Sequence, residues 1–162
     1  MAKAVLISIR PEWCEKIARG EKTVEVRKTR PKLETSFKCY IYRAKGTVPH
    51  IINGKWVQME VGGTIIAEFI CDRVETIKAA TEPYGIYDVD DQFVAQTGLV
   101  DGALWDYGKG ATLYGWHISN LKIYDDPKQL CEFKRLRKTK FGYEPVEIKR
   151  PPQSWCYVEK LK

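Results

Sequence analysis

Three residues that could do chemistry lie close together near the start of the chain. Lys22, Glu25 and Arg27 are found in the segment GEKTVEVR, residues 20–27. Arginine offers planar, forked donors that suit a phosphate or a base edge, and glutamate can accept from an amine or move a proton. Lysine supplies a point charge, or a base where burial lowers its pKa. A solvated ion pair on a strand surface fits the same pattern, so the residues alone leave both interpretations open.

The residues around this trio alternate in the manner of a β-strand. Glu25 and Arg27 fall on one face, and Val24 and Val26 fall on the other, which we expect to face the core. Lys22 has the parity of the valines. It must therefore precede the strand, or lie at a bulge, if its ammonium group is to reach the face of Glu25. The glycine that opens the segment permits such a bend.

The chain as a whole predicts a mainly β protein with short helices, of the α+β class, closed into a compact barrel. The expected strands are residues 3–10, 22–28, 37–44, 64–77, 111–124 and a short last one within 151–160. Residues 47–63 indicate a hairpin or an irregular segment, because Asn53-Gly54 is a strong turn signal.

Helices are expected to be few and short. Pro11 and Gly20 suit the first position and the end of a helix over 11–20. Acidic residues and Pro127 predict that another helix begins within 125–133, and a basic connection follows over 134–150. Residues 78–112 read as a mixed insertion with helical parts at 88–99 and 101–110. Nothing in the composition breaks the chain, so we expect a single domain over 1–162.

Charge and cysteine content narrow the class of protein. The 162 residues carry a net charge of +6, which favours an anionic partner such as nucleic acid, although simple solubility explains it equally well. Five cysteines occur without a CxxC pair, which predicts buried, reduced thiols and no zinc site. We expect a cytoplasmic, monomeric protein with no cofactor, no metal, no signal peptide and no membrane partner.

Other residues are candidates for the same ligand. Arg10 ends the first strand and could face the cleft beside the first helix. Lys28, with Arg30 and Lys32, forms a basic run that could follow a phosphate backbone or be a solvated loop. Trp13 could stack on a base, although a tryptophan at helical spacing is more often part of the core. The cluster KRLRKTK at 134–140 is either a second phosphate contact or a solvated surface. His117 has no identifiable triad partner.

The run Gly20-Glu21-Lys22-Thr23-Val24-Glu25-Val26-Arg27, after a strand and a short helix, resembles the GxKxxExR signature of the ASCH domain family. The segments GWHISNLKIYDDPKQLCEF and PPQSWCYVE look like the phage-associated branch of that family. The resemblance implies a PUA-like β-barrel with a cleft lined by Lys22, Glu25 and Arg27. It implies RNA, a nucleotide or a modified nucleoside as ligand, and it makes Ser119 a further contact.

The resemblance also raises enzymatic alternatives. Some small ASCH proteins are amidohydrolases that remove the acetyl group of acetylated cytidine, and they resemble this chain at Lys22. Their proposed nucleophile is a threonine where this chain has Glu25, and a carboxylate there requires a different mechanism. In such an enzyme Lys22 and Glu25 would be catalytic. The candidates for a second acid stay open and are Glu82, Asp88, Asp90 and Asp91. Ribonuclease activity, ascribed to another ASCH protein, is a further alternative.

Overall fold

The structure, a computed structural model, describes residues 2–100 and 102–162. The chain divides into two compact units, and strands β6 (Thr64–Ile77) and β7 (Leu113–Lys128) run through both. The first unit consists of Met1–Glu15, Lys38–Phe69 and Leu121–Lys162, and the second of Lys16–Phe37 and Ile70–Asn120. The expectation of a single domain stays a prediction.

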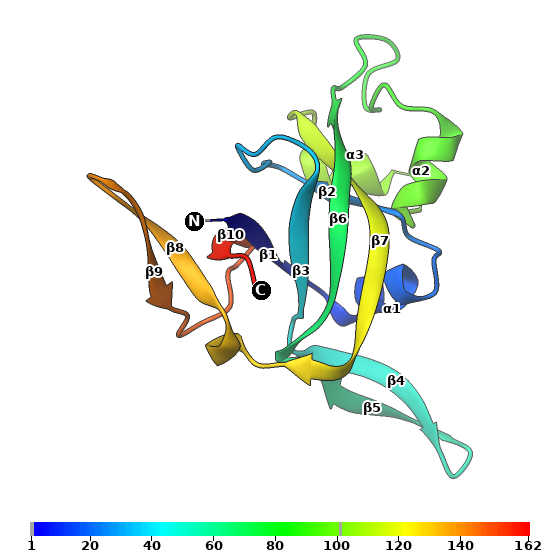
Figure 1. The fold of residues 1–162 in the computed structure, drawn as a ribbon. Helices are drawn as coiled ribbons and strands as arrows, with labels where there is room; N and C mark the ends of the chain where they lie inside the picture. The colour runs from blue at the N-terminus through cyan, green and yellow to red at the C-terminus, as the bar shows by residue number, and fades with distance from the viewer. Residues whose placement is uncertain (1, 101) are drawn as a thin grey trace. The chain divides into compact units, whose positions relative to one another are not determined.

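The first unit is built from strands (Figure 1). β1 (Lys3–Ile9) pairs in parallel with β3 (Phe37–Arg43) and antiparallel with β10 (Trp155–Glu159). β10 pairs with β8 (Lys134–Thr139), which forms a hairpin with β9 (Gly142–Glu147). Hydrogen-bonded neighbours here follow the order β6-β3-β1-β10-β8-β9. Apolar residues of these strands, together with Phe133 and Ile148 from the connections, form the core of the unit: Ala4, Leu6, Tyr40, Tyr42, Ile65, Phe133, Ile148, Cys156 and Val158.

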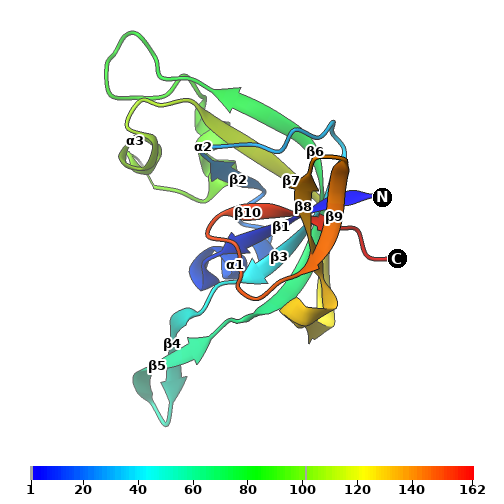
Figure 2. The same ribbon diagram turned by 90° about the vertical axis from the view of Figure 1, so that its left-hand side faces the viewer.

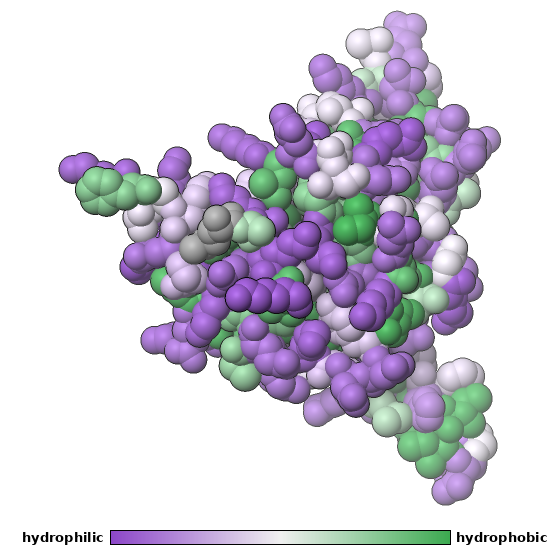
Figure 3. Space-filling model, viewed as in Figure 1, coloured by the Kyte–Doolittle hydropathy of each residue, from purple (hydrophilic) through white to green (hydrophobic). Residues whose placement is uncertain are grey.

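The β4–β5 hairpin also belongs to the first unit. β4 (Gly46–Ile52) and β5 (Lys55–Val61) pair in a separate two-stranded sheet, and Asn53 and Gly54 form the turn with positive φ, as predicted. Large apolar side chains are exposed along it, and Figure 3 shows a group of green, hydrophobic atoms over the hairpin. They are Ile51, Ile52, Trp56, Val57 and Met59.

The second unit carries most of the helical structure. α1 (Pro11–Ala18) leads into it from the first unit, and α2 (Asp91–Thr97) and α3 (Ala103–Gly108) lie beside β2 (Val24–Arg27) in both ribbon views (Figures 1 and 2). The strand order in this unit is β2-β7-β6. Its core consists of Val24, Val26, Ile77, Tyr87, Phe93, Leu104 and Leu113.

Most predicted elements are confirmed, and the chain is mainly β with short helices. Over the described residues there are ten strands, more than the sequence pattern indicated, and both strand orders given above are open. The closed barrel therefore stays a prediction.

The helix expected within 125–133 is wrong. β7 continues to Lys128 with Pro127 inside it, and only a 3-10 turn, η1 (Leu130–Glu132), follows. A proline lacks the N–H of a ladder bond and is tolerated near a strand end, so the Asp-Pro cue fits both structures. The turn is capped instead by Gln129, whose N–H donates to Glu132 Oε2 at 2.6 Å.

The basic connection expected over 134–150 is also wrong, because β8 and β9 occupy most of it. Leu136 is buried between the exposed Arg135 and Arg137, so the strand alternates with only one apolar residue pointing inward. Because most residues of this segment are charged, its sequence shows no clear alternation of apolar and polar residues from which a strand could be predicted. Among the cysteines, four are buried free thiols and Cys131 is exposed, which corrects the expectation that all five are buried.

Candidate functional site

A tight turn after α1 delivers Lys22 to the start of β2. Gly20 adopts a φ of +75° and donates to Ile17 O at 3.1 Å, and the Lys22 N–H donates to Lys16 O at 3.2 Å. β2 then begins at Val24, so Lys22 precedes the strand, as its parity required. The turn is what allows the ammonium group to point toward the polar face of β2.

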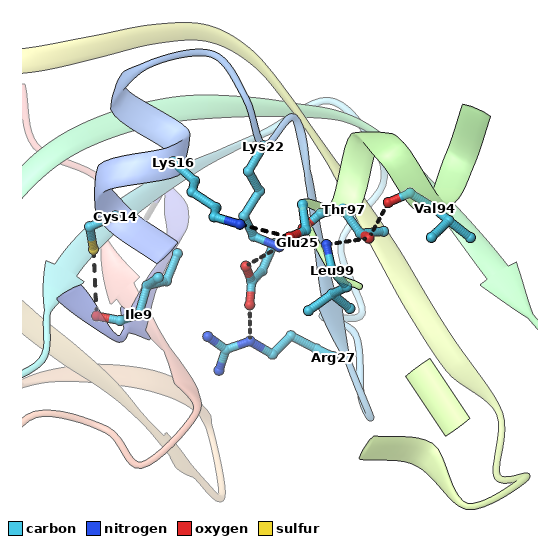
Figure 4. A network of polar contacts seen from close by, with 10 residues as sticks. Ile9, Cys14, Lys16, Lys22, Glu25, Arg27, Val94, Thr97 and Leu99 are labelled. Carbon is cyan, nitrogen blue, oxygen red and sulfur yellow. Dashed lines mark hydrogen bonds and ion pairs between the residues drawn. The ribbon is translucent and has the colours of Figure 1, made fainter. Parts of the chain in front are cut away.

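The Lys22, Glu25 and Arg27 side chains meet in one ion-paired network (Figure 4). Lys22 Nζ lies 3.3 Å from Glu25 Oε2, and Arg27 Nε donates to Glu25 Oε1 at 3.0 Å. Their side chains are exposed by only 3%, 9% and 12%, respectively. A carboxylate held between two cations at this depth is not the solvated surface pair that the sequence left open.

The C-terminus of α2 closes the network from a second side. Lys22 Nζ donates to Thr97 O at 2.7 Å, and Lys16 Nζ donates to Gly98 O at 3.0 Å. The last carbonyls of a helix lack intrahelical donors and carry partial negative charge, so two ammonium groups satisfy them. The Thr97 hydroxyl donates to Val94 O at 2.5 Å and accepts from Leu99 N at 3.2 Å, which fixes this end of the helix.

Burial controls the electrostatics of Lys22. Removal from water lowers the pKa of its ammonium group, and the charge and hydrogen bond of Glu25 offset part of that effect. Trp116 stands directly opposite Glu25 across the β2–β7 ladder and is fully buried. The ring of Phe37 packs against it edge to face, with the two ring centroids 6.0 Å apart. Directly opposed residues share a sheet face, so Glu25 and Trp116 lie on the same side of the sheet. The lowered pKa of Lys22 increases the fraction of the neutral amine at a given pH, and the neutral amine is the form that can accept a proton.

The network is most accessible at Arg27, where two further residues gather. Lys28 is exposed, and its Nζ lies 4.9 Å from the ring centroid of Tyr107, a residue of α3 that is 39% exposed. The pKa of the Tyr107 hydroxyl is raised overall, mainly because the group is buried. The charge of Glu25 adds to this increase, whereas the charge of Arg27 and a hydrogen bond with the Lys28 backbone partly offset it. Tyr107 thus lies within the electrostatic reach of the network.

Other predicted site residues are placed as follows. Arg10 is exposed just before α1, and Trp13 is half-buried on α1, both within the first unit. Ser119 is half-buried on β7 in the second unit. Their roles toward a ligand stay predictions.

The candidates for a second acid are also located. Glu82, Asp88 and Asp91 are exposed. Asp90 is the N-cap of α2 and accepts from the Phe93 N–H at 2.8 Å, which accounts for an acid at this position without any catalytic role. The choice among them for an active site stays open.

Residues that sequence reasoning missed come from outside the signature. Lys16, Thr97 and Tyr107 join the site through α1, α2 and α3, and no spacing rule connects them to Lys22. A separate polar group was also missed, in which His117 Nε2 lies 2.7 Å from Glu75 Oε1 and Arg73 Nη2 lies 3.0 Å from the same oxygen. The alternation of β6 was a weak signal for it, since Arg73 and Glu75 share a strand face.

Two negative findings concern the described part of the chain. Within residues 2–100 and 102–162, no three His, Cys, Asp or Glu side chains are grouped so as to hold a metal ion. No helix in the same ranges has both the length and the apolar character needed to cross a membrane.

Comparison with known proteins places the chain in a family. The family model described as ASCH domain matches residues 7–151. The chain therefore belongs to the ASCH domain family. The match does not resolve a branch, so the phage-associated branch stays a prediction. No curated protein gives a significant match.

Solved structures agree in fold. The chain is similar to the crystal structure of ASCH from Zymomonas mobilis, with a TM-score of 0.58 and 17% identity over 97% of this chain and 88% of the other. A mutant of that protein gives the same TM-score and identity, and the match covers 97% of this chain and 89% of the mutant chain. A second mutant gives 0.54 and 18% over 97% of this chain and 91% of the other. At such identity the likeness supports the fold alone.

Proposed function

We propose that this ASCH domain binds RNA or a nucleotide at the Lys22–Glu25–Arg27 network. The observation that carries the proposal is the buried carboxylate of Glu25 between two cations, at 3.3 Å from Lys22 Nζ and 3.0 Å from Arg27 Nε. Ordering charges in this way costs desolvation free energy, and functional sites are where that cost is commonly retained. The net charge of +6 supports an anionic ligand.

The burial of the network indicates how a ligand would approach. Lys22 and Glu25 are nearly inaccessible, and Arg27 is the most exposed of the three. Glu25 holds Arg27 through Nε, which orients the planar guanidinium for a phosphate or a base edge. In this proposal Arg27 and the exposed Lys28 contact the ligand, and Glu25 and Lys22 position Arg27.

A binding titration with short single-stranded RNA tests the proposal. Fluorescence anisotropy over a range of KCl concentrations should show affinity that falls steeply with salt, because phosphate contacts release counterions. Arg27→Lys keeps the charge but loses the planar fork, so affinity should fall about tenfold, or roughly 1.4 kcal/mol. Arg150→Lys is the matched control, since it makes the same change at an exposed arginine. Salt-independent binding, or equal affinity in both variants, would count against the proposal.

A second candidate function is hydrolysis of an acylated pyrimidine nucleoside, and the lowered pKa of Lys22 favours it. The neutral amine of Lys22 would take a proton from a water molecule as that water attacks the acyl carbonyl. The proton then passes to the departing amine, which leaves the acid and the free nucleoside as products. Glu25, held by Arg27, would orient Lys22 and would not replace the missing threonine as nucleophile.

Chromatography of acetylated cytidine after incubation with the protein tests this second function. Release of cytidine should disappear in Lys22→Met, which preserves side-chain length without a base. Release that does not exceed the Lys22→Met background would reject it. Gel analysis of the RNA used in the titration checks the ribonuclease alternative in the same samples.

A further inference from the structure

We propose that Tyr107 and Lys28 form a stacking platform for one unpaired base, so that the ligand of this domain is single-stranded and not duplex. The inference rests on the proposed function, because it names the class of nucleic acid that would reach Arg27.

The ring of Tyr107 is held in place and yet accessible. Tyr107 is the penultimate residue of α3 and is 39% exposed, so part of its ring faces water while the rest packs against the protein. Lys28 Nζ stands 4.9 Å from its ring centroid, within the range of a cation–π contact. Lys28 directly follows Arg27 in the chain, which puts the ring beside the accessible end of the network.

Contacts with Tyr87 and Leu113 hold the last turn of α3 in place. A Cβ on Gly108 would come within 2.0 Å of the Tyr87 hydroxyl oxygen and 2.8 Å of Leu113 Cδ1, so the helix approaches the core more closely than any side chain allows. The Tyr87 hydroxyl donates to Ala111 O at 2.7 Å and accepts from Gly110 N at 3.1 Å. These contacts involve Gly108, Gly110 and Ala111, which directly follow Tyr107, and they fix the end of the helix that carries it. A rigid ring loses little entropy on binding a base.

The chemistry around the ring suits a base attached to a phosphate. An aromatic face with a neighbouring ammonium group is attractive to a flat base, and Lys28 and Arg27 offer donors to the phosphate that accompanies it. A tyrosine hydroxyl is protonated at neutral pH, and burial raises the pKa of Tyr107 further from that range. The ring therefore presents an uncharged face. A paired base in a duplex hides its faces within the stack, so only an unpaired base could use this ring.

The test is a titration of three variants against two strands. The strands are a short single-stranded RNA and an abasic ribose-phosphate strand of equal length, which keeps the phosphates and removes the bases. Tyr107→Phe keeps the ring, Tyr107→Leu removes it, and Tyr84→Leu is the matched control at a tyrosine that is 86% exposed in the same unit. Thermal unfolding of each variant checks that the fold is retained.

The platform predicts a specific pattern of affinities. Tyr107→Leu should weaken RNA binding about 5- to 100-fold, which corresponds to roughly 1–3 kcal/mol per stacked base, with an unchanged salt slope. Tyr107→Phe and Tyr84→Leu should bind within about twofold of the unsubstituted protein. The Tyr107→Leu effect should vanish on the abasic strand, and a duplex of the same sequence should compete more weakly than the single strand.

Failure of the platform is distinguishable from failure of the proposed function. If RNA binds in a salt-dependent manner and Arg27→Lys weakens it, but Tyr107→Leu does not, the platform is wrong and the site stands. An equal loss on both strands, or a loss in Tyr107→Phe, would assign Tyr107 a role through its hydroxyl or the fold and would also overturn stacking. If the unsubstituted protein binds no RNA, both proposals fall together.

Discussion

Two groups of lysine and glutamate, one in each unit, show how burial changes the meaning of the same residue types. In the second unit, Lys22 and Glu25 are almost fully buried, and Glu25 stands opposite the buried Trp116 across the β2–β7 ladder. In the first unit, Lys38 pairs with Glu68 in an open polar cleft of about 400 Å³, where their side chains are 26% and 16% exposed. Both are ion pairs, but the side chains of the second are more exposed to solvent.

The difference appears in what each pair does to its surroundings. Desolvation dominates at Lys22 and lowers its pKa despite the adjacent carboxylate. In the cleft, burial and the neighbouring Glu68 raise the pKa of the Tyr124 hydroxyl, and Lys128 lies 5.3 Å from the ring of Tyr124. A buried pair stores a desolvation cost that a ligand or a proton can exploit, whereas a solvated pair contributes little beyond local geometry. Four substitutions would sharpen or break this contrast.

The largest effect is expected for Glu25→Ala. It leaves Lys22 and Arg27 buried without their shared carboxylate, and an uncompensated buried charge costs about 3–5 kcal/mol. Urea unfolding should show a free energy of unfolding that is lower by that amount. A loss below about 1 kcal/mol would mean that water already solvates the network, and the contrast between the two groups would disappear.

Lys22→Met should cost less, about 1–2 kcal/mol near neutral pH, because Arg27 still pairs with Glu25 and one desolvation penalty is removed. Its signature is the pH dependence. The pKa of Lys22 in the folded protein lies below the usual value of 10.5, so between those two values the unfolded chain binds the extra proton and stability rises with pH.

The unsubstituted protein should therefore gain stability relative to Lys22→Met as pH rises from the folded pKa toward 10.5. Unfolding curves at several alkaline pH values measure the difference. A stability difference that is flat, or that falls over this range, would contradict a desolvated lysine.

Glu68→Gln should cost about 1 kcal/mol, because it weakens the contact with Lys38 in a cleft that water enters. The same change should lower the pKa of the Tyr124 hydroxyl, since the Glu68 carboxylate contributes to raising it. Spectrophotometric titration of tyrosine, compared with Tyr124→Phe to assign the signal, checks this. A pKa that does not move would remove Glu68 as a cause.

Arg137→Ala should have the smallest effect, at most about 0.5 kcal/mol. Arg137 and Glu144 pair across the β8–β9 hairpin with side chains that are 67% and 44% exposed, and such pairs are weak and screened by salt. The measurement is the free energy of unfolding of both proteins with and without about 0.5 M salt, at which surface ion pairs are largely screened. A cost near that of Glu25→Ala would show that burial does not separate the two kinds of pair.

The sequence by itself determined the local structure and the identity of the central trio. The strands expected at 3–10, 37–44 and 64–77 correspond to β1, β3 and β6, Asn53-Gly54 predicted the β4–β5 turn, and the helical part expected within 88–99 corresponds to α2. The parity of Lys22 required that it precede its strand. All of these follow from interactions among near neighbours in the chain, which is why a sequence pattern can carry them.

Tertiary structure alone decided the depth of the site and its remaining members. Thr97, Gly98 and Tyr107 reach the network because α2 and α3 fold back beside β2, and the partner of Glu25 across the ladder is set by the register with β7. The basic segment at β8 is a strand whose one apolar residue, Leu136, is buried in the folded protein. Desolvation depends on what packs around a group from distant parts of the chain, so the pKa of Lys22 could not be inferred from its neighbours in sequence.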